Sequence, residues 1–286
     1  MCIRDSNLSE GLKFQPGLRV ETNCQTCNYT QLRMNGLAGG YSQILINGRP
    51  IFSPLTGLYG LEQIPVNMIE RIETIRGGGS TLYGSSAIGG VVNVITKIPK
   101  SNNIEISYAH QSIKSATNEN IFNGNATLVS KDKSTGIALF ANKRTREYYD
   151  ANGDNFSELP ALENTAYGAS LFYLPNENQK LEASISHLNE YRYGGEMVDQ
   201  TAHLNQQAED RTHDVWMGSL DYQINFNEDK SALIAYLSGQ RTNRDHYTGI
   251  FPDDPPAIET HLSLSLIHIS EPTRPRLISY AVFCLK

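Results

Sequence analysis

Hydrophobic and polar residues alternate with a period of two along much of the second half of the chain. The segments NIEISYAH, QKLEASISHL and VWMGSLDYQINF show it: in the first, Ile104 and Ile106 alternate with Glu105 and Ser107. This alternation is typical of strands in an antiparallel sheet that has one face on an apolar environment. It predicts strands near residues 103–110, 120–131, 135–145, 164–174, 179–189, 212–226 and 230–241.

The connections between these predicted strands alternate in length. SKDKST, PNENQ and NEDK are tight, whereas residues 111–119, 146–163 and 190–211 are long and polar. Short turns at one end and long loops at the other are the pattern of an outer-membrane barrel. Tyr173, Tyr222 and Phe226, near strand ends, would suit its interfacial aromatic girdles; ordinary aromatic residues of strands are the alternative. A soluble β-sandwich produces the same alternation of residues but makes no such demand on its loops.

The barrel interpretation predicts a topology. The tight links at Asp132, Asn176 and Asp229 would be periplasmic, and the long segments around Asp150, Glu196 and Tyr247 would lie outside the cell. Each predicted strand has about the 9 to 11 residues that a tilted membrane strand needs. The residues predicted to face lipid, with their polar neighbours facing inward, are Ile106, Leu139, Leu171, Ile185, Leu220 and Leu233.

The first hundred residues have a different texture, with short apolar runs broken by turn signals. LRMNGLAGGYSQILINGRPIF holds two strand-like segments, with Asn35-Gly36 and Asn47-Gly48 as turn dipeptides. IPVNMIERIETI begins as a short helix or turn after Pro65 and continues into a strand. These features predict a small mixed domain that is too polar between its strands to be a barrel wall.

A glycine-rich link, IERIETIRGGGSTLYGSSAIGGVVNVITK at residues 69–97, joins two strongly β-prone runs. A phosphate-binding P-loop would need a Lys after Gly84, where Ser85 follows. A dinucleotide fingerprint would need a glycine in place of Leu82 and a helical pattern after it. The structural interpretation therefore remains: glycine supplies backbone angles and close approaches that other residues cannot.

This link resembles the signature that closes the plug domain of TonB-dependent outer-membrane receptors. The resemblance extends back through GLEQIPVNMIERIE and QILINGRPIF to QPGLRVE. It is strong over residues 11–100 and covers the barrel portion in texture only; Gly77-Gly78-Gly79 stands where many members have Gly-Pro. It implies a mixed α+β plug domain at 7–100, followed at 101–263 by the N-terminal third of an antiparallel transmembrane β-barrel of about 22 strands.

The function that the resemblance implies is active uptake of a scarce, large nutrient across the outer membrane of a Gram-negative bacterium. In this family the nutrient is typically a ferric siderophore, haem or cobalamin, and the energy comes from the TonB-ExbB-ExbD complex. No grouping of nucleophile, base and orienting residue is found, so neither an enzyme nor a cofactor is expected. The alternatives are an outer-membrane barrel adhesin or a passive porin with a plugging domain, without active transport, and, more remotely, a soluble sugar-binding sandwich.

The resemblance also implies roles for single residues. Arg71, Glu73 and Arg76 are expected to pair with charges on the barrel wall, because an unpaired buried charge costs several kcal/mol; a solvated strand edge is the alternative. Candidate substrate contacts lie on loops expected to face outward, although plain packing of the plug explains them equally well: Tyr29, Phe52, Leu55 and Tyr59.

Cys24 and Cys27 form an isolated CxxC pair. A zinc site would need a second pair of ligands, and the sequence has none beside these cysteines. A thioredoxin-like redox site would need a strand followed by a helix, which the residues after Cys27 do not predict. In the oxidising periplasm that the resemblance implies, a local disulfide is expected, and no metal site.

The two ends match translated sequencing-adapter DNA. MCIRD at the start, and LSLIHISEPTR and ISYAVFCLK at the end, correspond to it in a compatible order, so residues 1–6 and 264–286 are expected to be non-native and to pack on nothing. Without the four basic and two acidic residues of these ends, 20 of 24 basic and 28 of 30 acidic residues remain, a net charge of −8. This acidity argues against a nucleic-acid partner.

Overall fold

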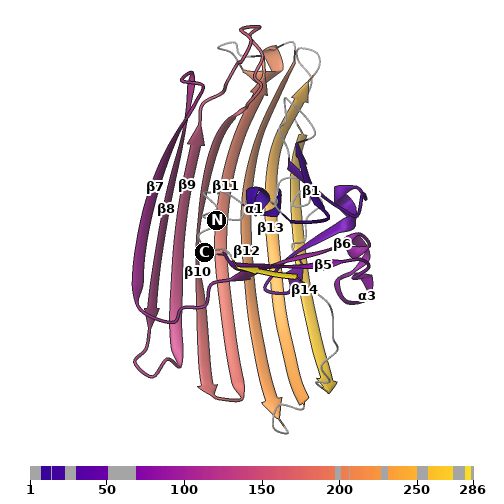
Figure 1. Ribbon diagram of the computed structural model, residues 1–286, viewed down its shortest axis with the longest axis vertical. Coiled ribbons are helices and arrows are strands. Elements are labelled where there is room, and N and C mark those ends of the chain that lie inside the picture. The colour runs from indigo at the N-terminus through magenta and orange to yellow at the C-terminus, as the bar shows by residue number, and fades with distance from the viewer. Residues whose placement is uncertain are drawn as a thin grey trace.

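The computed structural model contains two parts, a small mixed domain and a tall open sheet, with the domain lying against one face of the sheet (Figure 1). The structure describes residues 8–13, 15–22, 30–50, 69–196, 201–205, 207–226, 231–249, 257–272 and 281–284. None of the helices in these ranges is long and apolar enough to cross a membrane.

The small domain consists of short helices and two sheets. A two-stranded sheet pairs β1 with β2, and a second sheet has the order β15-β5-β6-β3-β4. The central strand β6 pairs in parallel with β3 and antiparallel with β5. The elements are α1 (Leu8–Lys13), β1 (Leu18–Thr22), β2 (Thr30–Met34), η1 (Gly39–Tyr41), β3 (Ser42–Ile46), β4 (Arg49–Pro50), β5 (Ile69–Arg76), α3 (Ser80–Tyr83), η3 (Ser85–Ala87), β6 (Gly90–Thr96) and β15 (Ala281–Cys284).

The core of this domain forms on both faces of β6. On one face, Val92 and Val94 pack with Leu12 of α1 and with other aliphatic residues of β2, β3 and β5. On the other face, Val91 packs with Leu45 and Ala87. Burial on both faces explains why this strand reads as an apolar run rather than as an alternation.

The structure confirms that the glycines of the glycine-rich link serve backbone geometry and close packing. It folds into two short helical turns, α3 and η3, between β5 and β6. Gly90 has φ 147°, and a Cβ built on it would lie 2.6 Å from the carbonyl oxygen of Ile75 and 2.6 Å from Cε of Met34. The predicted turns also form, with positive φ at Asn35-Gly36 and Asn47-Gly48.

The tall sheet is antiparallel, and its strands follow one another in chain order from β7 to β14. All seven predicted strands are present, most of them longer than predicted, and an eighth strand, β14, extends the sheet (Figure 1). The strands are β7 (Asn103–Ile113), β8 (Thr117–Val129), β9 (Thr135–Arg146), β10 (Ala161–Asn176), β11 (Gln179–Gly195), β12 (Ala208–Phe226), β13 (Ser231–Gly249) and β14 (Ala257–Pro272).

The two faces of this sheet differ as the alternation predicts. The residues predicted to face lipid share the outer face: Ile106, Ile185 and Leu220 are 68%, 55% and 48% exposed. Leu139 and Leu171 are exposed on the same face, and Leu233 is half-buried there. The inner face is polar and buried at many positions, including Asn142, Asn164, Glu190 and Gln240.

Two expectations are wrong, one about a connection between strands and one about the end of the chain. Residues 111–119 are not a long loop, because β7 and β8 continue into a tight turn at Lys114 and Ser115, where φ is positive. The end of the chain does not pack on nothing either: residues 264–272 pair with β13, and β15 pairs with β5. Without these segments one edge of β13 and one edge of β5 would have unpaired backbone groups along it, and such an edge accepts an extended segment.

Candidate functional site

Arg49, at the start of β4, makes one contact between the small domain and the sheet. Its Nη2 atom forms an ion pair with Oδ1 of Asp221 on β12. The centre of its guanidinium lies 3.5 Å from the centroid of the Tyr236 ring on β13. A cation over an aromatic face is attracted by the ring quadrupole, so the two contacts reinforce each other.

The Asn47-Gly48 turn places Arg49 there. The N–H of Gly48 donates to Oδ1 of Asn93 at 2.8 Å. The Nδ2 atom of Asn47 donates to Oγ1 of Thr96 at 2.8 Å, and the N–H of Thr96 donates to Oδ1 of Asn47 at 2.9 Å. This turn is therefore fixed to β6, which lies in the centre of the sheet, and it presents Arg49 from a rigid base.

A cavity of about 220 Å³ lies beside Arg49, between this domain and the inner face of the tall sheet. Ile46, Asn47, Thr96 and Lys97 line it on one side. On the other side it is lined by residues of β7 to β13, most of them small or polar, among them Ser170, Ser184, Leu188, Met217, Ser219, Ser238 and Gln240.

A band of charged side chains crosses the inner face near the end of the sheet that carries the long connections. Glu190 accepts from Arg192 through both carboxylate oxygens, at 3.0 and 3.1 Å, and from Nδ2 of Asn164 at 3.2 Å. Nη1 of Arg211 pairs with Oε1 of Glu209, two positions away along β12. We call these residues and their neighbours the charged band: Glu119, Arg144, Asn164, Glu190, Arg192, Glu209, Arg211 and His213.

The charged band is deeply buried. Glu190, Arg192, Arg211 and His213 are each no more than 2% exposed. Burying charges is costly unless they are paired, and the opposite charges here lie two positions apart on one strand face. The sequence signal is the alternation Glu-x-Arg and Glu-x-Arg-x-His at the ends of β11 and β12, which our sequence analysis missed.

The predicted wall-contacting residues all lie on β5. The Nε atom of Arg71 donates to Oε1 of Glu73 at 2.9 Å, and Nδ2 of Asn93 donates to Oε2 of Glu73 at 3.2 Å. The guanidinium of Arg76 lies beside Gly17. Arg71 and Glu73 thus pair with each other inside the small domain, and their pairing with wall charges stays a prediction.

The remaining predicted site residues lie outside the described residues. They are the candidate substrate contacts and the cysteine pair: Tyr29, Phe52, Leu55, Tyr59, Cys24 and Cys27.

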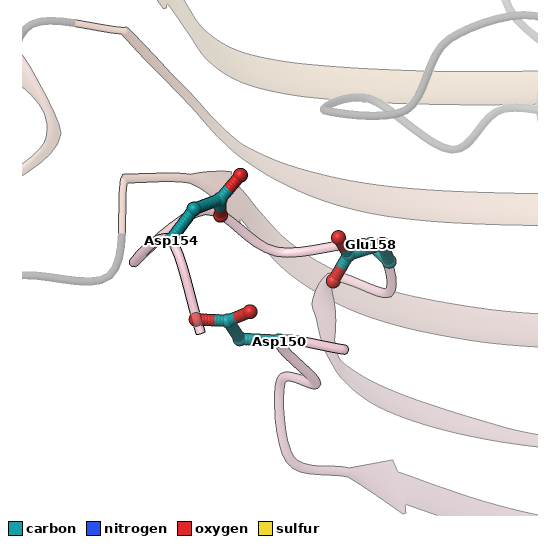
Figure 2. Close-up of side chains that lie close together, drawn as sticks. All are labelled: Asp150, Asp154 and Glu158. Atoms are coloured by element: carbon teal, nitrogen blue, oxygen red, sulfur yellow. The ribbon is translucent and has the colours of Figure 1, made fainter. Parts of the chain in front are cut away.

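Three carboxylates gather in the connection between β9 and β10. One oxygen from each of Asp150, Asp154 and Glu158 lies within 4.8 Å of the others (Figure 2). Such oxygens are the ligands that calcium takes in proteins. Asp150, however, already accepts from the N–H groups of Gly153 at 2.7 Å and Asn155 at 2.9 Å. These bonds lower the pKa of Asp150, that from Gly153 most, and they give the carboxylate a structural role in the loop.

Comparison with known proteins assigns the small domain. Residues 3–91 match the family model of the TonB-dependent receptor plug domain. An iron-regulated outer membrane virulence protein of Vibrio cholerae serotype O1 is 37% identical over 123 residues, which are 40% of this chain and 18% of that protein. A probable TonB-dependent siderophore receptor, PirA, of Acinetobacter baumannii is 26% identical over 263 residues, 85% of this chain and 32% of that one.

A solved structure shares the whole architecture. The crystal structure of the siderophore receptor PirA from Acinetobacter baumannii superimposes with a TM-score of 0.74 at 19% identity, covering 91% of this chain and 42% of that chain. At this identity the likeness shows the fold: a plug domain followed by antiparallel barrel strands. The chain spans less than half the length of each of these proteins.

Proposed function

Since this chain belongs to the TonB-dependent outer-membrane receptors, with their plug domain at 3–91 and strands of their barrel after it, we propose that the receptor takes up a scarce, large nutrient by active transport. The nutrient class is a metal chelate or cofactor such as a ferric siderophore, haem or cobalamin. The Acinetobacter baumannii relative is named a siderophore receptor, and we propose no enzymatic activity for this chain.

The observation that carries this proposal is the plug domain seated on the polar inner face of the barrel strands. A lumen filled by a folded domain cannot pass a large solute by diffusion, so transport has to displace that domain. Energy must then be supplied, and we propose the TonB-ExbB-ExbD complex as its source. The outer face, with Ile106 and Ile185 exposed, is proposed to contact outer-membrane lipid.

We propose a structural role for the charged band. It lies on the inner face, at the end of the sheet where the long connections emerge, and so on the proposed route of an arriving nutrient. Arg192 and Arg211 are buried in their pairs with Glu190 and Glu209, so we propose that the band shapes and holds this part of the wall rather than contacting the nutrient directly. We propose the outward-facing plug residues Tyr29, Phe52, Leu55 and Tyr59 as the opposite side of that route.

Uptake in living cells tests the proposal. The receptor gene would be expressed in a bacterium that lacks its own iron receptors, and cell-associated ⁵⁵Fe would be measured with a panel of ferric siderophores and haem, and ⁵⁷Co with cobalamin. We expect accumulation of at least one of them, abolished when tonB is deleted. Accumulation that persists without TonB would favour a passive porin, and cell adhesion without any accumulation would favour an adhesin.

We also propose where the two domains of this chain begin and end. We propose that the plug domain covers residues 7–100 and that barrel residues continue to 263, with residues 1–6 and 264–286 of non-native origin. Reads trimmed of adapter sequence test the last point, because they should not encode Ile267 to Lys286 downstream of His261.

A further inference from the structure

Arg49 occupies a socket built by neighbouring strands of the wall. In the register of the sheet, Glu182 on β11 lies directly opposite Asp221 on β12, and Asp221 lies directly opposite Tyr236 on β13. Directly opposed residues share a face, so one row across three strands presents two carboxylates and an aromatic ring to the plug.

The socket needs a cation. Two like charges directly opposite each other on neighbouring strands are destabilising. Lys180 lies 2.9 Å from Glu182 and offsets one of them, and Arg49 pairs with the other. Burial lowers the pKa of the Arg49 guanidinium, while charge at Tyr236 and Glu182 opposes that shift, which places Glu182 within electrostatic reach. The side chains of Arg49 and Asp221 are only 19% and 17% exposed, so water screens the pair weakly.

Other arginines of the plug behave differently. Arg19 and Arg33 both pair with Glu21 at 2.6 and 2.7 Å, and Arg71 pairs with Glu73 at 2.9 Å. Each of these pairs stays within the plug, whereas the Arg49 pair bridges to the wall. Because Arg49 also lines the cavity, this contact lies at the edge of a space between the plug and the wall.

We propose that Arg49 is a latch: its seat between Asp221, Glu182 and Tyr236 holds the plug against β11 to β13, and its release widens the adjoining cavity into a passage along the wall. The passage would run between Asn47 and Thr96 on the plug and Ser184, Ser219 and Ser238 on the wall. Its use by a nutrient rests on the proposed function; the latch itself does not.

Single-channel conductance of the complete receptor in planar lipid bilayers tests the latch, because it needs neither nutrient nor TonB. We expect Arg49→Ala to raise the fraction of time spent in conducting states about tenfold over the parent, which corresponds to about 1.4 kcal/mol. Arg19→Ala is the matched control, because it removes a plug arginine that is 78% exposed and pairs within the plug. It should leave the conductance at the parental level.

Two further variants separate the latch from general damage. Asp221→Asn removes the wall side of the same pair and should raise the conductance as Arg49→Ala does. It keeps the test possible if Arg49→Ala fails to assemble. The exchange Arg49→Asp with Asp221→Arg restores opposite charges and should return the receptor toward the closed state. The latch is overturned if Arg49→Ala and Asp221→Asn conduct like Arg19→Ala, or if the exchange conducts as much as Arg49→Ala. Failure of the uptake assay together with raised conductance would reject the transport function and leave the latch standing.

Discussion

Gly90 begins the central strand of the plug in a backbone conformation that side chains disfavour. Its φ is 147°, and an added Cβ would lie 2.6 Å from the carbonyl oxygen of Ile75, which is backbone and cannot swing away. Such strain costs about 1–3 kcal/mol, and the clash adds to it. We therefore expect Gly90→Val to lower the stability of the plug by about 2 kcal/mol or more.

Calorimetry of the purified receptor would measure this loss of stability as a lower unfolding temperature of the plug domain. Gly40→Ala is the control, because a Cβ there would meet nothing within 4 Å. Equal transition temperatures for the two variants would contradict the assignment of Gly90 to close packing. The sequence suggested this role for the glycines, since the phosphate-binding alternatives lacked their Lys and their third glycine.

Asp132, in the turn between β8 and β9, should titrate at unusually low pH. Its carboxylate accepts from Oγ of Ser130 at 2.5 Å and from Oγ of Ser134 at 2.8 Å. These hydrogen bonds, that of Ser130 foremost, lower its pKa to about 2. Because the folded pKa is below the unfolded value of about 3.9, the carboxylate stabilises the turn above that value. The contribution is lost as the pH falls through about 2.

Carboxyl ¹³C NMR of aspartate-labelled receptor follows this titration, with Asp132→Asn to identify the signal. We expect Ser130→Ala to move the midpoint upward and Ser115→Ala, in a turn between other strands, to leave it unchanged. A midpoint near 4 in the parent would show that the turn does not hold the carboxylate as described.

At the scale of the strand, Leu220 and Ser219 are neighbours on β12 that face opposite sides of the sheet. Leu220 is 48% exposed on the outer face, and Ser219 lines the cavity on the inner face. Arginine on the lipid face near mid-depth costs about 2–4 kcal/mol. We expect Leu220→Arg to destabilise the receptor by that amount in lipid vesicles and Ser219→Arg to cost less, as measured by urea unfolding. Equal costs would argue against a lipid-facing outer surface.

The strands were predictable where their outer face is apolar and less so beyond that part. β11 was predicted to end at 189 and continues to Gly195, and β13 was predicted to end at 241 and continues to Gly249. Toward the end of the sheet that carries the long connections, the outer face is no longer apolar: Thr212 and Asp214 occupy it on β12. The alternation then fades, although the backbone ladder continues, and a reading based on periodicity ends the strand too early.

At the scale of the molecule, the contacts that join plug and wall leave no local signal in the sequence. Arg49 directly follows the Asn47-Gly48 turn that the sequence predicts, but its partners Asp221 and Tyr236 follow more than 170 residues later. Only the register of β12 and β13 brings those two side chains into one row. Resemblance pointed instead to Arg71 and Glu73, whose alternation on β5 equally fits the ion pair that they form with each other.

The antiparallel order of β7 to β14 places alternate connections at opposite ends of the sheet. In a membrane receptor only one of these ends is exposed to the outside of the cell. Ala151, in the connection between β9 and β10, and Asn178, in the turn between β10 and β11, are both exposed and lie at the two ends of β10. In the complete receptor we expect Ala151→Cys on intact cells to react with a membrane-impermeant maleimide and Asn178→Cys to react only after the outer membrane is permeabilised. Detection of the labelled receptor on a gel decides between the two ends. The reverse pattern would show that the barrel has the opposite orientation, with the charged band on the periplasmic side. Equal labelling of both sites would show that no membrane separates them, and it would contradict the transport proposal.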